Sequence, residues 1–183
     1  MENLAKIGLG MNNYDVAQKF HAIYDKAAGL YARGQRGAET FFSPEEKSWL
    51  AGNGLTPQHL YDYAEDQTNA GEPGYDIALA IESVRRDYFR NVQGHQASGT
   101  VLDEGSLPPK DAKLDGIEWL PQIIPTARAK LRGELPPSLM YSCGGDRKFF
   151  KQNDILPSEF LTLIGRAGVD EAAIVSWVRL QKK

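Results

Sequence analysis

Apolar side chains recur at helical spacing along almost the whole chain. No stretch shows the alternation of apolar and polar residues that is typical of a strand. Two long segments, residues 14–34 and 74–94, carry apolar residues three or four positions apart, which places these side chains along one helix face. The positions are Val16, Phe20, Ile23, Ala27 and Leu30 in the first segment, and Ile77, Ile81, Val84 and Tyr88 in the second. The pattern predicts an all-α protein, an orthogonal bundle of about seven or eight helices without a substantial sheet.

Shorter helices are predicted where a capping residue precedes a proline. Ser43 stands before Pro44 and three residues ahead of Glu46, which is the arrangement of a capping box. Thr56 precedes Pro57 in the same way. Both helices are therefore expected to begin at their prolines.

Two local features refine the longer helices. Glu82 and Arg86 are four residues apart, so an ion pair along the helix surface is expected between them. Pro125 lies within the helical pattern of residues 118–137. Proline has no N–H, and its ring clashes with the preceding turn. This helix is therefore expected to begin near Pro125 or to kink there.

The charges divide the chain into three parts. Residues 1–93 carry nine basic and thirteen acidic side chains and form an acidic helical part. Residues 94–116 lose the helical pattern and gather Gly, Ser, Pro and Asp, which indicates a linker or long loop. Residues 117–183 form a smaller part with ten basic and seven acidic side chains. The smaller part is marginal as a domain, so we expect both parts to pack as one body, with Val101 and Leu102 docking the loop.

Composition excludes several classes of protein. No run approaches the roughly 18 apolar residues of a membrane span, and the start of the chain lacks a basic segment followed by an apolar one, so neither a membrane segment nor a signal peptide is predicted. A single cysteine excludes an intramolecular disulfide and a zinc site made of several thiolates. Residues 117–183 have a net charge of +3, which is far from the dense basic stripe that nucleic-acid binding requires, so no nucleic-acid partner is predicted. A cytoplasmic location is expected.

One group of side chains has the spacing of a metal site. His59, Asp62 and Asp66 stand at positions i, i+3 and i+7, so all three share one helix face. A metal ion accepts such ligands, but acidic side chains near a helix end are usually solvated. No metal site is predicted.

The stretch of residues 140–154, MYSCGGDRKFFKQND, contains the only cysteine, Cys143. Two glycines before a short helix allow an anion to approach its unpaired N–H groups, and Arg147 adds positive charge. A thiol at this position can become nucleophilic when its pKa is lowered. A lone cysteine is also commonly a buried apolar residue. A structural turn, an anion site and a reactive thiol are the three alternatives.

Asp146 is the expected capping residue of this helix, which would then begin at Arg147. Its carboxylate would compete with an anion for the free N–H groups. Arg128, on the preceding helix, is expected to donate a charged hydrogen bond to Asp146 and so to connect the turn to the core.

The last third of the chain resembles a bacterial domain-of-unknown-function family (DUF5069-like). The similar motifs, in residues 116–183, are WLP at 119–121, ARAKL at 127–131, and YSC at 141–143 followed by Asp146 and Arg147. The resemblance implies no particular reaction. It implies that these motifs belong to one structural unit.

These observations favour a binding or interaction module without catalysis, for a small anionic ligand or a protein partner. The alternative is a cysteine-dependent enzyme or redox protein that uses Cys143. No cofactor class is indicated. The candidate ligand-binding residues are Tyr141, Gly144, Gly145, Asp146, Arg147 and Arg128.

Overall fold

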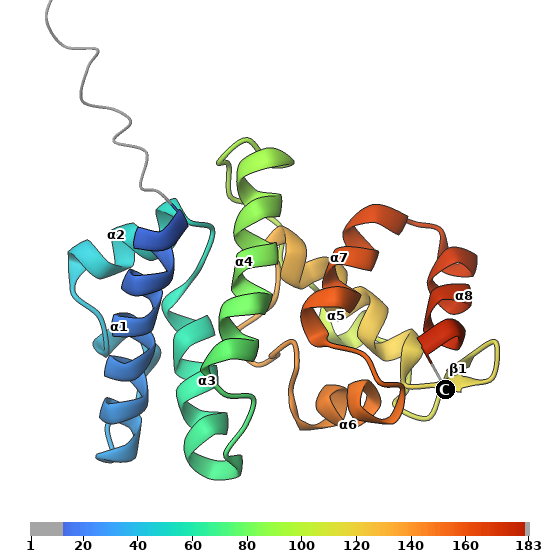
Figure 1. Ribbon diagram of the computed structural model, residues 1–183, viewed down its shortest axis with the longest axis horizontal. Helices are drawn as coiled ribbons and strands as arrows, with labels where there is room; N and C mark the ends of the chain where they lie inside the picture. Colours follow the sequence, from blue (N-terminus) through green and yellow to red (C-terminus); the bar gives the residue numbers. More distant parts are fainter. Residues whose placement is uncertain (1–12, 182–183) are drawn as a thin grey trace, which may run out of the picture.

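The computed structural model describes residues 13–181, and these are mostly helical (Figure 1). Eight α-helices and a two-stranded sheet in this part of the chain confirm the all-α prediction. The predicted absence of a signal peptide concerns residues outside the described range. The elements are α1 (Asn13–Ala32), η1 (Ala38–Thr40), α2 (Pro44–Gly52), α3 (Pro57–Ala70), α4 (Tyr75–Asn91), η2 (Glu104–Ser106), β1 (Lys113–Leu114), β2 (Ile117–Glu118), α5 (Leu120–Arg132), α6 (Gly144–Gln152), α7 (Pro157–Ala167) and α8 (Glu171–Gln181).

The predicted starts of α2 and α3 are confirmed. The Ser43 hydroxyl accepts a hydrogen bond from the N–H of Glu46, and the Glu46 carboxylate accepts one from the N–H of Ser43, which completes the capping box. The Thr56 hydroxyl accepts from the N–H of His59. Each helix begins at the proline that follows its cap.

Two apolar clusters form the core, one at each side of α4 (Figure 1). The first joins α1, α2 and α3, and includes Phe20, Ile23 and Leu60. The second joins α5 to α8, and includes Ile123, Phe150 and Phe160. The buried positions of α1 include four of the five predicted ones, and Leu30 is partly buried.

Helix α4 lies between the two clusters and packs against α1, α5 and α7 (Figure 1). It therefore buries residues on several faces, including the charged side chains of Glu82 and Arg85. The expected surface pair of Glu82 with Arg86 is wrong. Glu82 is 2% exposed and binds Lys130, whereas Arg86 donates to the side chain of Asn53. The i, i+4 spacing of two charged residues on one helix cannot predict an ion pair between them when another helix covers one of the two positions.

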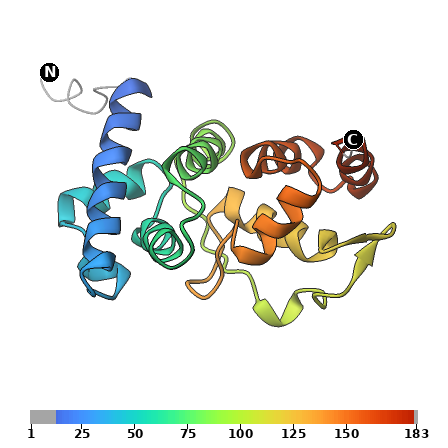
Figure 2. The same ribbon diagram turned by 60° about the horizontal axis from the view of Figure 1, so that its bottom comes forward.

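The long connection after α4 runs along the C-terminal helices to a hairpin at the end of the molecule far from α1 (Figure 2). The Leu102 N–H donates to the carbonyl of Glu134, which attaches the connection to the end of α5. Val101 is 64% exposed, so the expectation that it docks with Leu102 is wrong. Strands β1 and β2 pair antiparallel around Asp115 and Gly116. Strands of two residues are too short to show an alternating pattern.

Helix α5 begins at Leu120 and continues through Pro125. Of the two expected alternatives, a start near Pro125 is therefore wrong, and Pro125 lies inside the helix. Because Pro125 has no N–H, the carbonyl of Pro121 receives no hydrogen bond from it. Within residues 13–181, no helix is both long and apolar enough to cross a bilayer.

Candidate functional site

Helix α6 begins three residues before the predicted position. Cys143 is its N-cap residue, and Gly144, Gly145 and Asp146 form its first turn. The prediction that Asp146 caps the helix is therefore wrong. Its carboxylate is buried and accepts hydrogen bonds from the N–H of Ser142 and from Nε1 of Trp119, both at 2.9 Å. Tertiary contact with Trp119, 27 residues earlier, determines the position of this carboxylate.

The expected bond between Arg128 and Asp146 is also wrong. Nε and Nη2 of Arg128 donate to the carbonyl of Gly168, at 3.1 and 2.9 Å, and its Nη1 lies 3.8 Å from the Glu171 carboxylate. Arg128 therefore connects α5 to the turn between α7 and α8, and the structure does not bring it together with the α6 turn.

Arg147 has acidic partners from the other half of the molecule. Its Nη1 lies 2.6 Å from the carboxylate of Asp66 on α3, and its Nε lies 3.1 Å from that of Glu72. Nη1 also donates to the carbonyl of Ser142 at 2.8 Å. Lys151 binds the other oxygen of Glu72. The guanidinium group thus connects α6 to α3, and an added anion would have to displace a carboxylate.

Cys143 is partly buried beside the Asp146 carboxylate, and Tyr141 is fully buried. Burial, followed by the negative charge of Asp146, raises the pKa of the Cys143 thiol. A nucleophilic cysteine needs the opposite shift. Tyr141 is 1% exposed, and its hydroxyl donates to the carbonyl of Pro157 at 2.7 Å. Both side chains support the packing of the turn.

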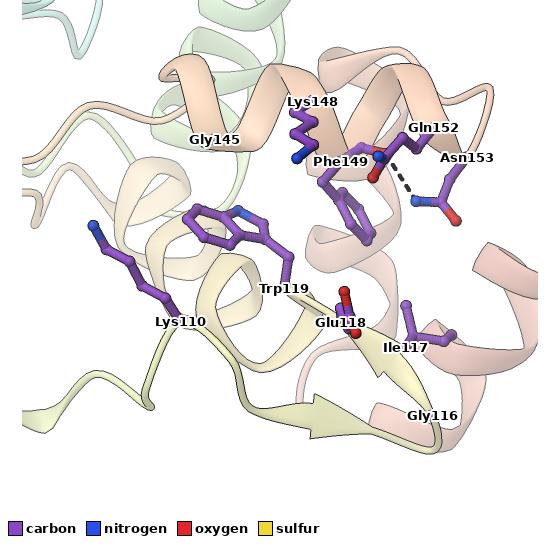
Figure 3. Close-up of a pocket in the computed structure, with 10 residues that line it drawn as sticks. All are labelled: Lys110, Gly116, Ile117, Glu118, Trp119, Gly145, Lys148, Phe149, Gln152 and Asn153. Atoms are coloured by element: carbon purple, nitrogen blue, oxygen red, sulfur yellow. Dashed lines mark hydrogen bonds between the residues drawn. The ribbon is translucent and has the colours of Figure 1, made fainter.

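A groove opens beside this turn, with the indole of Trp119 in it (Figure 3). Its volume is about 390 Å³. It is bordered by the hairpin, by α6 and by the connection before β1. The lining residues are Lys110, Gly116, Ile117, Glu118, Trp119, Gly145, Lys148, Phe149, Gln152 and Asn153. Of the predicted ligand-binding residues, this groove contains Gly145.

The backbone of Trp119 is strained. It is the residue before α5 and has a left-handed conformation, with φ 67° and ψ −18°. This region costs a bulky L-residue about 1–3 kcal/mol. Ser142, with φ 69°, is in the same region. Asp146 accepts a hydrogen bond from both residues, so one buried carboxylate holds both strained positions.

Gly145 allows the indole to approach α6. A Cβ atom built on Gly145 would lie 2.4 Å from Cζ2 of Trp119, which is far inside van der Waals contact. The same construction on Gly144 meets nothing closer than Arg147, at 3.8 Å. Of the two glycines, only Gly145 is required by the packing of Trp119.

Two lysines at the groove lack an acidic partner. Lys110 comes from the connection before β1 and Lys148 from α6, and their ammonium groups lie on opposite sides of the Trp119 indole (Figure 3). Within the described range, neither ammonium group forms an ion pair. The nearby Glu118 carboxylate binds Lys113 at 2.6 Å. Glu118 also interacts electrostatically with Lys148, but the three lysines outnumber this carboxylate, so the groove keeps a net positive charge.

A second group of charges is buried where α3, α4 and α5 meet. The Lys130 ammonium lies 2.6 Å from Oε1 of Glu82, and the Tyr63 hydroxyl donates to the same oxygen at 2.7 Å. Nδ1 of His59 lies 3.5 Å from Oε2 of Glu82. We call Glu82, Lys130, Tyr63, His59 and Asp62 the seam cluster. It joins the two halves of the bundle.

The environment of the seam cluster shifts its pKa values. Burial alone would raise the pKa of Glu82, but the charges of Lys130 and His59 lower it well below its usual value. Burial lowers the pKa of His59 and of Lys130. Burial raises the pKa of Asp62 to about 7, although the hydrogen bond from Gln58 opposes this change.

The seam cluster has no room for a substrate. The cavity lined by His59, Asp62, Tyr63 and Lys130 has a volume of about 10 Å³, which is close to the space that one water molecule needs. The expectation that the acids near the end of α3, Glu65 and Asp66, are simply solvated is wrong, because Glu65 accepts a hydrogen bond from Tyr31 and Asp66 binds Arg147. Asp62, nearer the middle of the helix, is desolvated. In residues 13–181, no three His, Cys, Asp or Glu side chains are placed to hold a metal ion.

Sequence reasoning missed the groove. The available signal was the pair Asp115–Gly116, since Asp-Gly is a strong indication of a two-residue hairpin turn. Both residues have positive φ, 51° and 81°, as such a turn requires. The hairpin places Trp119 directly after β2. No sequence signal pairs Glu82 with Lys130, which are 48 residues apart.

Comparison of the chain with protein-family models, with curated proteins and with solved structures finds no match.

Proposed function

We propose that this protein binds a small planar anion in the Trp119 groove. The observation that carries the proposal is a strained, partly buried tryptophan between two lysines that have no acidic partner in the described structure. Strained backbone is concentrated at functional sites, because the surrounding structure must stabilise it. An aromatic face and neighbouring positive charge together suit a planar anion.

The dimensions of the groove support a small ligand. Pockets for small molecules have volumes of about 300–1,000 Å³ and are lined by apolar and aromatic side chains with a few polar groups. The groove, at about 390 Å³, has Trp119, Phe149 and Ile117 for apolar contact. Lys110 and Lys148 supply the charge.

A binding function without catalysis fits the chemistry of the turn before α6 better than the alternative, an enzyme or redox protein that uses Cys143. The raised pKa of Cys143 keeps the thiol protonated. The cytoplasmic location expected from the sequence stays part of this proposal, since a chain with one cysteine gains no intramolecular disulfide from an oxidising compartment.

The proposal is tested with 2-naphthoate, a planar aromatic anion, followed by the indole N–H signals in NMR. The Trp119 signal, assigned with Trp119→Phe, should shift on titration, while those of Trp49 and Trp177 stay in place. Lys148→Glu should weaken binding by about tenfold, equivalent to about 1.4 kcal/mol. Lys47→Glu on α2 is the matched control and should bind as the wild type does. The proposal fails if Trp119 does not respond, or if neutral 2-naphthylmethanol binds equally well.

A further inference from the structure

We infer that the ligand of the Trp119 groove is a nucleoside monophosphate, a heteroaromatic ring that carries one phosphate. This inference rests on the proposed function and specifies the class of ligand. Three features of the groove support it: its charge, the face of the indole, and the polar side chains at the α6 end.

The charge of the groove matches a phosphate monoester better than a carboxylate. Two ammonium groups, those of Lys110 and Lys148, face the cavity (Figure 3). Glu118 binds Lys113 at 2.6 Å and also interacts electrostatically with Lys148, so the three lysines and this one carboxylate leave a net positive charge at the groove. A phosphate monoester carries a charge of about −1.5 to −2 at pH 7. A carboxylate would leave one of the two lysines without a partner.

The chemistry of the lysine side chain also suits it to binding a phosphate group. Lysine acts as a flexible point charge and is a common phosphate ligand. Lys110 and Lys148 come from two separate segments, the connection before β1 and α6. Their ammonium groups lie on opposite sides of the Trp119 indole (Figure 3), so contact of both with one phosphate requires rotation of these long, flexible side chains.

Trp119 indicates that the ligand carries a planar ring. The indole is held by its hydrogen bond to Asp146 and by its contact with Gly145, so it is a rigid surface on which a planar ring can stack. Every nucleobase has a flat aromatic face, so any of them can stack on an aromatic side chain, and this stacking contributes favourably to the binding free energy. A rigid aromatic surface loses little conformational entropy on binding.

Polar side chains at the C-terminal end of α6 favour a ligand with a heteroaromatic ring over one with a hydrocarbon ring. Gln152 lines the groove with an amide that can both donate and accept. Asn153 also lines it and is 5% exposed. Its Nδ2 donates to the carbonyl of Phe149 at 2.8 Å, while its buried Oδ1 has no donor among residues 13–181. This oxygen lies at the far end of the groove and points away from the Trp119 indole (Figure 3), so a ring amino group would reach it through a water molecule.

The experiment compares AMP, GMP, CMP and UMP with their parent nucleosides, inorganic phosphate and 2-naphthoate, using the full chain and calorimetry. At least one nucleotide should bind ten times more tightly than its nucleoside, than phosphate and than 2-naphthoate. The substitutions Lys110→Gln and Lys148→Gln should each weaken the binding of that nucleotide about tenfold. Each should change the affinity for the nucleoside less than twofold. Lys47→Gln is the control and should leave both unchanged.

The outcomes separate the two claims. If 2-naphthoate binds with a response from Trp119 and no nucleotide binds more tightly than it does, the nucleotide inference is overturned and the proposed function stands. If neither compound shifts the Trp119 signal, both are overturned. Equal affinity for nucleotide and nucleoside would also overturn the inference, because the phosphate would then contribute nothing.

Discussion

The Trp119 groove and the seam cluster contain the same kinds of side chain in opposite situations. In the seam cluster, Lys130 is 3% exposed and lies 2.6 Å from Glu82, which also accepts a hydrogen bond from Tyr63. In the groove, Lys110 and Lys148 face an open cavity and have no acidic partner in the described structure. The seam encloses space for about one water molecule, whereas the groove has a volume of about 390 Å³.

The difference shows that perturbed pKa values alone do not identify the functional site of this protein. Strong shifts often mark active sites, but structural ion pairs shift pKa values as well. Strong shifts occur in the seam cluster, where the Glu82–Lys130 ion pair connects α4 to α5. The groove is identified instead by backbone strain, free charge and open volume.

The largest effect is expected from breaking the buried ion pair between Glu82 and Lys130 in the seam cluster. Glu82→Ala leaves the Lys130 ammonium buried without a counter-charge, which should lower the free energy of unfolding by about 3–5 kcal/mol in urea denaturation. The double variant Glu82→Leu, Lys130→Met should recover most of this loss, because apolar residues of similar size often replace a buried ion pair without cost.

Lys113→Ala is the matched control for the seam variant. It removes the exposed pair with Glu118 and should change the free energy of unfolding by less than about 1 kcal/mol. If Glu82→Ala costs no more than Lys113→Ala, the seam cluster does not hold the two halves together.

A smaller change in stability, with loss of ligand binding, is expected from Gly145→Ala. The added methyl group would overlap the indole of Trp119, and such overpacking costs about 1–3 kcal/mol. Gly144→Ala is the matched control in the same helical turn and should change stability by less than about 0.5 kcal/mol. Urea denaturation and 2-naphthoate titration of both variants check this. Equal behaviour of the two variants would show that Trp119 does not need Gly145.

The effect that is smallest per pH unit concerns the pH dependence of stability at Asp62. Its folded pKa is about 7, above the usual value for an aspartate, so the folded state binds more protons than the unfolded state between about pH 4 and 7. Stability should therefore fall as pH rises through this range, relative to Asp62→Asn, by at most about 1.4 kcal/mol per pH unit. The difference should be constant above about pH 8.

Urea denaturation of wild type and Asp62→Asn at pH 4, 5.5, 7 and 8 measures this difference. Asp111→Asn, in the exposed connection before β1, is the control. A constant difference between wild type and Asp62→Asn across all four pH values would show that burial does not shift the titration of Asp62.

Local sequence patterns predicted the parts of the fold that local interactions determine. The capping box of Ser43 and Glu46 spans three residues, and its geometry follows from the sequence alone. The apolar stripe of α1 likewise depends on spacing along one helix. The same local reasoning was wrong for Asp146, because Trp119 and Ser142 donate to its carboxylate.

The sequence by itself determined the all-α class, the starts of α2 and α3 and, within residues 13–181, the absence of any long strand, because periodicity and capping act over a few residues. Only the tertiary structure decided which charges are neutralised. Arg147 meets Asp66 across 81 residues, and Lys130 meets Glu82 across 48. Lys110 and Lys148 have no such partner in the described structure, and this makes their groove the candidate site. Coulomb energy depends on distance and on burial, and both are properties of the packed chain.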